Sequence, residues 1–182
     1  RRRWFAIAAI GRDRPGIVAD LSECAYACGC NLEDASMTML GSEFATLMLV
    51  SSTADDAQDR LSDAFRRLEW ERRLTVFVRP LDGAPTPLVA ADAAPYRLVA
   101  EGVDKAGIVA RISRCLADRD IHIADLRSCM TPVPESGTPV YTLTLRMNLP
   151  AESVAEIGAL QAELAAIADE LRVDVSMEPL TD

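Results

Sequence analysis

The chain has 182 residues, of which 49% are hydrophobic and 26% charged, and its formal net charge is −9 at pH 7. This composition is typical of a globular protein, and no apolar run approaches the roughly 20 residues that a membrane-spanning helix needs. Nucleic-acid binding depends mainly on clustered Lys and Arg, whereas here 28 carboxylates outnumber 19 basic side chains. We therefore expect a cytoplasmic protein that contacts neither a membrane nor a nucleic acid.

The first half of the chain contains apolar stretches of two kinds. Apolar residues in short runs or in alternation predict strands, and apolar residues three or four apart predict helices. The predicted elements are a strand at 4–10, a helix at 17–28, strands at 31–40 and 43–51 with a tight turn at Gly41-Ser42 between them, a helix with its apolar face at 57–68, and a strand at 73–80. This βαββαβ order is that of the ferredoxin-like arrangement, an α+β fold with an antiparallel sheet and helices on one face.

The second half of the chain repeats the first at a shift of 91 residues. AIGRDRPGIVADLSEC at 9–24 aligns with AEGVDKAGIVARISRC at 100–115, and nine of the sixteen positions are identical. The elements predicted for the second copy are strands at 96–102, 121–131, 140–148 and 171–178 and helices at 108–119 and 151–168. Residues 81–95 are rich in Pro, Ala and Asp, which favours a linker. We expect two ferredoxin-like domains in tandem, 1–80 and 96–182.

The two predicted sheets differ in the side chains that face away from the helices. In the strand 140–148, polar Thr and Arg side chains alternate with apolar ones, as in a sheet with one face in water. In the strand 43–51, Phe44 and Met48 on one face and Leu47 on the other are all apolar. An apolar face needs cover. We expect the outer face of the first sheet to pack on the second domain, a second chain or a partner protein.

The chain has five cysteines, an odd number that does not suggest a secreted disulfide framework. Cys24 and Cys28 fall on the apolar face of the first predicted helix, where free cysteine packs as a small hydrophobe. Cys24 recurs as Cys115 in the second copy, and no further pair with metal-ligand spacing follows. We expect these thiols to pack in the core and to bind no metal.

The stretch GRDRPGIVAD, residues 11–20, joins the first strand to the first helix. Pro15 suits the first helical turn, where its missing N–H is not needed, and Gly16 allows close approach to its backbone N–H. Free N–H groups at a helix start form an anion site, so Gly16 and Ile17 could hold a carboxylate. A well-capped strand-to-helix turn without a ligand accounts for the same residues.

DRPGIV at 13–18, followed by GCNLEDA at 29–35, resembles the ACT domains, which are small-molecule-sensing modules of amino-acid metabolism. More narrowly, CNLEDASMTMLGSEFATLMLVSS at 30–52, with the degenerate second copy, is similar to the glycine cleavage system transcriptional repressor family. The resemblance implies ferredoxin-like domains that pair and bind amino acids at the interface of the pair. It further implies a homo-oligomer without a cofactor that represses by contacting a transcription activator and does not touch DNA.

Carried onto this chain, the resemblance implies a ligand site made of the strand-helix loop and the start of the second strand. The implied ligand-binding residues are Asp13, Arg14, Pro15, Gly16, Ile17, Val18, Asn31 and Leu32. The implied ligand is a small amino acid, glycine or a relative. Asn31 offers donors and an acceptor that suit a zwitterion, and Asp13 or Glu33 could meet its ammonium. A simple turn residue at the strand entry accounts for Asn31 equally well.

The second copy departs from this pattern. A weaker second site would comprise Asp104, Gly107, Ile108 and His122. The positions of Arg14, Pro15 and Asn31 hold Lys105, Ala106 and His122. A lone His without converging partners more often packs or lies at a strand edge than binds a ligand. We expect the first loop to form the better site.

Other functions of this fold fit the sequence less well. RNA-recognition domains carry basic and aromatic residues on the third strand, which SEFATLMLV at 42–50 lacks. One His and no nucleophile–base or paired-carboxylate pattern argue against an enzyme. Arg14 with Asn31 leaves acylphosphatase-like catalysis as an alternative. A sensory subunit of a metabolic enzyme and an interaction module without a ligand are further alternatives.

Overall fold

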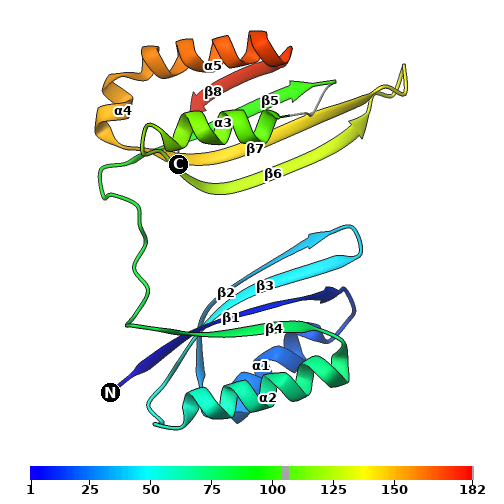
Figure 1. Cartoon of the computed structure of the whole chain (residues 1–182), viewed down its shortest axis with the longest axis vertical. Helices are drawn as coiled ribbons and strands as arrows, with labels where there is room; N and C mark the ends of the chain where they lie inside the picture. The colour runs from blue at the N-terminus through cyan, green and yellow to red at the C-terminus, as the bar shows by residue number, and fades with distance from the viewer. Residues whose placement is uncertain (104–106, 182) are drawn as a thin grey trace. The chain divides into compact units, whose positions relative to one another are not determined.

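The computed structural model of the chain describes residues 1–103 and 107–181. It contains two compact units, Arg1–Thr86 and Pro87–Asp182, and the division lies inside the stretch that its composition marks as a linker. Each unit has one four-stranded antiparallel sheet with its helices along one face (Figure 1). Within the described ranges, no helix is long and apolar enough to cross a membrane. The tandem ferredoxin-like fold predicted from the sequence is confirmed.

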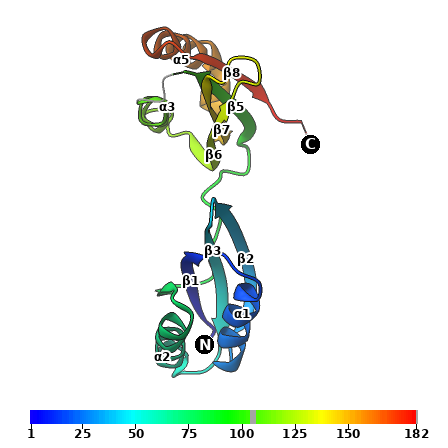
Figure 2. The same cartoon turned by 90° about the vertical axis from the view of Figure 1, so that its right-hand side faces the viewer.

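The first unit has the six elements that its apolar pattern predicts. They are β1 (Arg3–Arg12), α1 (Ile17–Ala27), β2 (Asn31–Leu40), β3 (Glu43–Ser52), α2 (Ala57–Arg72) and β4 (Thr75–Leu81). The strand order is β2-β3-β1-β4, and Figures 1 and 2 show the β2–β3 hairpin. Because β1 and β2 are both antiparallel to β3, they run in the same direction. The start of β2 therefore lies at the same end of the sheet as the start of β1.

Alternate side chains of the strands and one stripe of each helix form the core of this unit. Phe5 and Ile7 of β1, Leu21 of α1, and Leu61 and Phe65 of α2 are each at most 1% exposed. Leu61 and Phe65 are four residues apart, the spacing that places two side chains on one helix face. The periodicity that predicts these elements is thus the periodicity of the buried surface.

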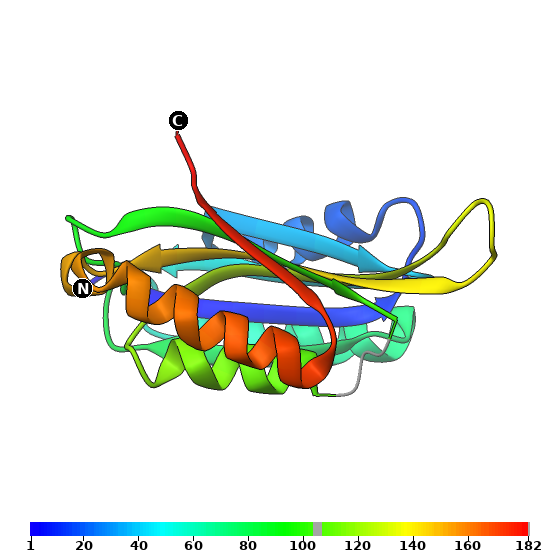
Figure 3. The ribbon, with the colours of Figure 1, turned by 90° about the horizontal axis from the view of Figure 1, so that it is seen from above.

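The second unit repeats this architecture with one difference. Its elements are β5 (Ala94–Gly102), α3 (Ile108–Ala117), β6 (His122–Pro132), β7 (Pro139–Leu149), α4 (Ala151–Ala155), α5 (Ile157–Leu171) and β8 (Asp174–Pro179), with strand order β6-β7-β5-β8. The prediction of a single helix at 151–168 is wrong, because the backbone leaves the helical region at Glu156, with φ −102° and ψ 24°. Gly158, a poor helix former, follows closely. The β6–β7 hairpin extends beyond the neighbouring strand β5 (Figures 1 and 3).

The same close contact occurs inside each unit, at the end of its first strand. Helices α2 and α5 are capped at their C-termini by Arg73 and Arg172, which both take the left-handed conformation. A Cβ added at Gly11 or at Gly102 would lie 2.5 Å from the buried side chain that follows this cap. Gly11 and Gly102, which align in the repeat, are therefore explained by close packing at the end of the strand. They lie before the part of each loop that could face a ligand.

The predicted contrast between the outer faces of the two sheets is confirmed. In β3, Phe44 and Met48 are buried toward the helices, whereas Leu47 on the opposite face is 52% exposed. In β7, Leu145 is buried toward the helices and Arg146 is exposed on the opposite face. The outer face of the first sheet is therefore apolar, and the outer face of the second sheet is polar.

Candidate functional site

The loop between β1 and α1 is held beside the β2–β3 turn. The backbone N–H of Asp13 donates to the carbonyl oxygen of Ser42 at 2.9 Å. Helix α1 begins at Ile17, so Pro15 precedes the helix, and its predicted place in the first helical turn is wrong. Gly16 is the N-cap residue, with φ 89°, a left-handed conformation that residues with a side chain rarely adopt. The glycine is thus required by the backbone of this loop.

The first turns of α1 and α3 have the same open N-terminus. In the described part of the chain, neither N-cap glycine, Gly16 or Gly107, is accompanied by a side-chain capping hydrogen bond. The first N–H groups of a helix have no intrahelical acceptor, and they lie at the positive end of the helix dipole. Ile17 and Ile108 are buried in the core, so they can offer a ligand only their backbone. Both helix starts have the geometry that favours a carboxylate.

Arg14 of this loop is folded onto α1. Its guanidinium donates to Oδ2 of Asp20 at 2.6 Å and to the carbonyl oxygen of Pro15 at 3.2 Å. Asp20 also pairs with Nε of Arg72, at the end of α2, at 3.2 Å. The hydrogen bond from Arg14 and the charges of both arginines lower the pKa of Asp20. Arg14 therefore fastens the loop to the two helices, a role that the sequence analysis missed.

Asn31 lies far from the loop within its own domain. It pairs with Ser51, which pairs with Trp4 at the start of β1, whereas the loop follows Arg12 at the other end of that strand. At about 3.4 Å per residue, the strand from Trp4 to Arg12 spans about 27 Å. Asn31 and the loop therefore do not meet within one domain, and the implied site at the interface of a pair stays a prediction. Arg14 and Asn31 are separated for the same reason, which removes the basis for acylphosphatase-like catalysis within one domain.

Val18, near the start of α1, and Leu32, near the start of β2, line the wall of one cavity. The cavity, of about 190 Å³ between α1 and β2, is also lined by Ser22 of the helix and Met37 and Met48 of the sheet. Val18 and Leu32 are each about half exposed, at 48% and 49%. The cavity wall is mostly apolar, so it suits a hydrocarbon or thioether side chain better than a charged group.

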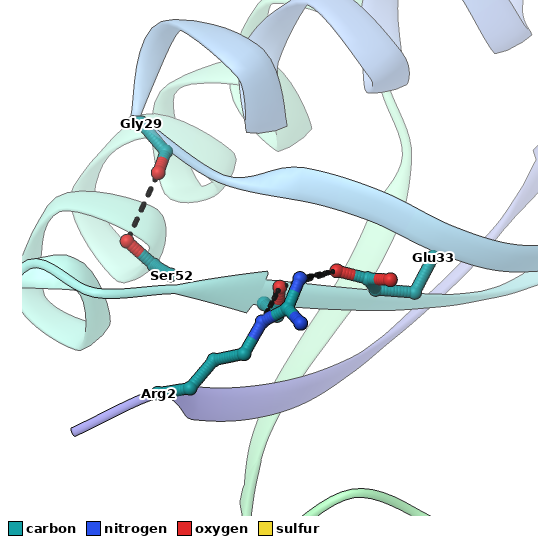
Figure 4. A network of polar contacts seen from close by, with 5 residues as sticks. Arg2, Gly29, Glu33 and Ser52 are labelled. Carbon is teal, nitrogen blue, oxygen red and sulfur yellow. Dashed lines mark hydrogen bonds and ion pairs between the residues drawn. The ribbon is translucent and has the colours of Figure 1, made fainter.

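Glu33 is engaged by a polar network and not by the loop. Arg2 donates from Nε to Oγ of Ser51 at 3.0 Å and from its terminal nitrogen to Oε1 of Glu33 at 2.5 Å. Ser51 donates to the same carboxylate oxygen. Figure 4 shows Arg2 reaching from just before β1 toward Glu33 on β2, with Ser52 bonded to the carbonyl oxygen of Gly29 nearby. Glu33 already has a cationic partner here, which weakens its assignment to a ligand ammonium.

The second copy holds its predicted residues in equivalent places. Gly107 is the N-cap of α3, with φ 74°. His122 is exposed at the start of β6 and pairs with Asn148, as Asn31 pairs with Ser51 in the first copy. Asp104, with Lys105 and Ala106, lies outside the described residues. His122 is therefore also at the opposite end of its sheet from the helix start.

Cys24, Cys28 and Cys115 pack in the two cores. Cys28 and Cys115 are 4% and 2% exposed, and Cys24 is partly buried against the first core. Burial is the largest cause that raises the pKa values of Cys24 and Cys115 to about 11. The prediction of core packing is confirmed for these thiols.

A family model for the ACT domain matches residues 4–79. The glycine cleavage system transcriptional repressor of Escherichia coli is 26% identical over 176 residues, which make up 97% of this chain and 90% of that protein. A UPF0237 protein of Methanopyrus kandleri is 38% identical over 77 residues, 42% of this chain and 86% of that protein.

A solved structure is similar over the full length. The crystal structure of an unknown protein from Galdieria sulphuraria has a TM-score of 0.79 at 27% identity and covers 100% of both chains. The ACT-domain match and the full-length similarity to the repressor confirm the resemblance, and this structure shows that the fold extends over the whole chain.

Proposed function

Because the chain belongs to the ACT-domain family, with two such domains in tandem, we propose that it is a non-enzymatic regulator that responds to an amino acid and acts through contact with another protein. The observation that carries the proposal is the open helix N-terminus behind a left-handed glycine, Gly16, which suits an α-carboxylate. The full-length similarity to the Escherichia coli repressor supports control of the glycine cleavage system as the regulated process. The net charge of −9 favours a protein partner, such as a transcription activator, over DNA.

The proposed ligand site is shared between two copies of the chain. The helix start at Gly16 and the amide of Asn31 lie at opposite ends of the sheet of the first domain. Each end of one domain therefore provides only half of the proposed ligand site. In a pair of copies, the helix start of one holds the carboxylate while Asn31 of the other meets the ammonium and carboxylate with its donors and acceptor. Asp13, exposed beside the helix start, supplies a negative charge for the ammonium.

A thermal-unfolding screen against free amino acids tests this proposal. A ligand that binds only the folded state stabilises it by about 2.7 kcal/mol at 100 times its dissociation constant. We expect glycine or a close relative to raise the unfolding temperature of the wild type, and Asn31→Ala to abolish the shift. His122→Ala, at the equivalent position of the second domain, is the matched control and should retain it.

The outcomes separate the alternatives. A shift that persists in Asn31→Ala and disappears in His122→Ala would move the site to the second domain. If no amino acid changes the unfolding temperature at millimolar concentration, the chain is not an amino-acid sensor, and the interaction module without a ligand takes its place.

A further inference from the structure

The outer face of the first sheet, which we define as the side of β1–β4 away from α1 and α2, is an open apolar surface. Ile10 on β1, Leu47 on β3 and Phe77 on β4 project from it and are 55%, 52% and 67% exposed. Strand register places Leu47, Ala8 and Phe77 side by side in one row across three strands. A contiguous apolar surface of this kind marks an interaction site in a folded protein.

Large and small side chains alternate across the two central strands of this face. In each of three successive rows, one of the paired residues on β1 and β3 is large and the other is alanine. The pairs are Ile10 with Ala45, Ala8 with Leu47, and Ala6 with Leu49. The large residue is on β1 in the first row and on β3 in the next two rows. The surface therefore has projections and hollows that are offset to either side of the line between β1 and β3.

The edges of the same face carry opposite charges. Asp34 on β2 pairs with Leu49, which pairs with Ala6, and Ala6 pairs with Arg79 on β4. Asp34 and Arg79 are thus at the two ends of one row, both exposed. Among residues 1–103 and 107–181, neither belongs to an ion pair. The face is negative at one edge and positive at the other.

We infer that two copies of the chain pack through this face, related by a two-fold axis that runs between β1 and β3 and parallel to them. Rotation about this axis exchanges the two sides of the face, so Leu47 of one copy lies over the partner's Ala8, and Asp34 lies opposite the partner's Arg79. Two-fold interfaces must be self-complementary in this way. Aligned sheets pack about 10 Å apart with interdigitating side chains, which the alternation of large and small residues allows.

The extent of the face matches a stable interface. Four strands about 4.8 Å apart and up to ten residues long cover about 600 Å² in projection. Two copies would bury about 1,200 Å² or more, the lower end of the range for specific protein interfaces. The network of Arg2, Glu33 and Ser51 lies at the Trp4 end of the face and supplies a polar rim.

A second copy fits this face better than a polar surface does. The corresponding face of the second sheet carries Arg97 paired with Glu178, and Thr142 bonded to Glu101. Such charged side chains keep their hydration and do not match an apolar surface. The first sheet of another copy offers both the apolar character and the matching charges.

Sedimentation velocity on the full-length chain tests the inference. Leu47→Lys should halve the mass of the assembly or raise its dissociation constant at least tenfold. Thr144→Lys, at the equivalent place on the outer face of the second sheet, should leave the mass unchanged. Because Leu47 is exposed, its replacement should leave the circular dichroism spectrum and the unfolding transition intact, which separates lost assembly from lost folding.

Charge exchange gives a second, independent readout. Asp34→Arg and Arg79→Asp should each weaken the assembly at low salt, and the double variant should restore it, because each charge meets the other residue of the partner. The inference is overturned if the wild type is monomeric at 100 µM or if Leu47→Lys leaves the mass unchanged. It is also overturned if the double charge variant assembles no better than the single ones. The two-fold axis places equivalent ends of the two sheets together, so this pair does not bring Gly16 to the partner's Asn31, and the proposed ligand site uses another contact between copies. Leu47→Lys should therefore lose assembly through this face and keep the amino-acid shift, which distinguishes the two proposals.

Discussion

Replacing Gly102 by Ala should destabilise the second domain more than the matched change at Gly11 destabilises the first. A Cβ at Gly102 would lie 2.5 Å from Cγ1 and 3.3 Å from Cβ of Val173. Valine is β-branched, which restricts rotation about its χ1 bond, so it cannot turn away cheaply. A Cβ at Gly11 would be obstructed by Cδ2 of Leu74 at 2.5 Å, the far end of a side chain that can rotate, whereas its other neighbours, the carbonyl oxygen of Arg73 at 3.5 Å and Cα of Leu74 at 3.7 Å, are at ordinary contact distances.

The expected magnitudes follow from these contacts. Overpacking a core costs about 1–3 kcal/mol, and exchanging Gly for Ala recovers about 0.5–1 kcal/mol through the unfolded chain. We expect a net loss of about 1–2 kcal/mol for Gly102→Ala and of about 0–1 kcal/mol for Gly11→Ala. In a domain of this size, 1 kcal/mol corresponds to roughly 4–8 °C in the midpoint of thermal unfolding.

Hydrogen exchange read by mass spectrometry is the appropriate assay, because a two-domain chain need not unfold in one step. Peptides from β5 and β8 should exchange faster in Gly102→Ala, and those from β1 and β4 should not. Adding Val173→Ala should remove most of the cost of Gly102→Ala, since the obstructing atoms are gone. The reasoning is refuted if Gly11→Ala costs as much as Gly102→Ala, or if Val173→Ala leaves the cost of Gly102→Ala unchanged.

Two further predictions concern ionisable groups. Arg14→Ala should raise the pKa of Asp20 in an NMR titration more than Arg72→Ala does, because the hydrogen bond from Arg14 is the largest cause of its lowering. Since the pKa of Asp20 is lowered on folding, the ionised carboxylate stabilises the first domain above its unfolded pKa of about 3.9. This contribution is lost as pH falls through the folded pKa. An equal rise of the Asp20 pKa in Arg14→Ala and Arg72→Ala would contradict the assignment. In thiol labelling at pH 8, the exposed Cys129 should react first, whereas the buried Cys115, with a pKa of about 11, should react only on unfolding. Early labelling of Cys115 would contradict this prediction and show that the core around it opens in the native state.

The sequence was a good guide to the elements and to the glycine turns, because these are local properties. Periods of two and of 3.6 residues mark the strands and helices whose buried faces form each core. Gly16 marks a left-handed cap because few other residues adopt that conformation. The one helix predicted wrongly, at 151–168, is interrupted at Glu156, two residues before Gly158, a poor helix former that an apolar helical pattern does not reveal as a break.

The site was predicted less well, because it depends on contacts across the chain. Asp20, the partner of Arg14, is shared with Arg72, at the end of a helix that follows two strands later. Glu33 is engaged by Arg2, and no periodicity reports such a pair. The distance between Asn31 and the loop, however, was accessible from the order of the elements. In a split βαβ unit the first two strands are parallel, so the start of the second cannot meet the end of the first.

The sequence by itself determined that this chain is a tandem of two ferredoxin-like domains, that each first helix starts behind a glycine, and that the first sheet is apolar on both faces. These properties follow from residue type and spacing along short segments. Only the tertiary structure decided which of the candidate residues meet. It joined Arg14 to Asp20 and Asp20 to Arg72, placed Val18 and Leu32 on the wall of one cavity, and aligned large with small residues across β1 and β3. Strand register and chain direction determine these neighbours, and both depend on packing between residues that are distant in sequence.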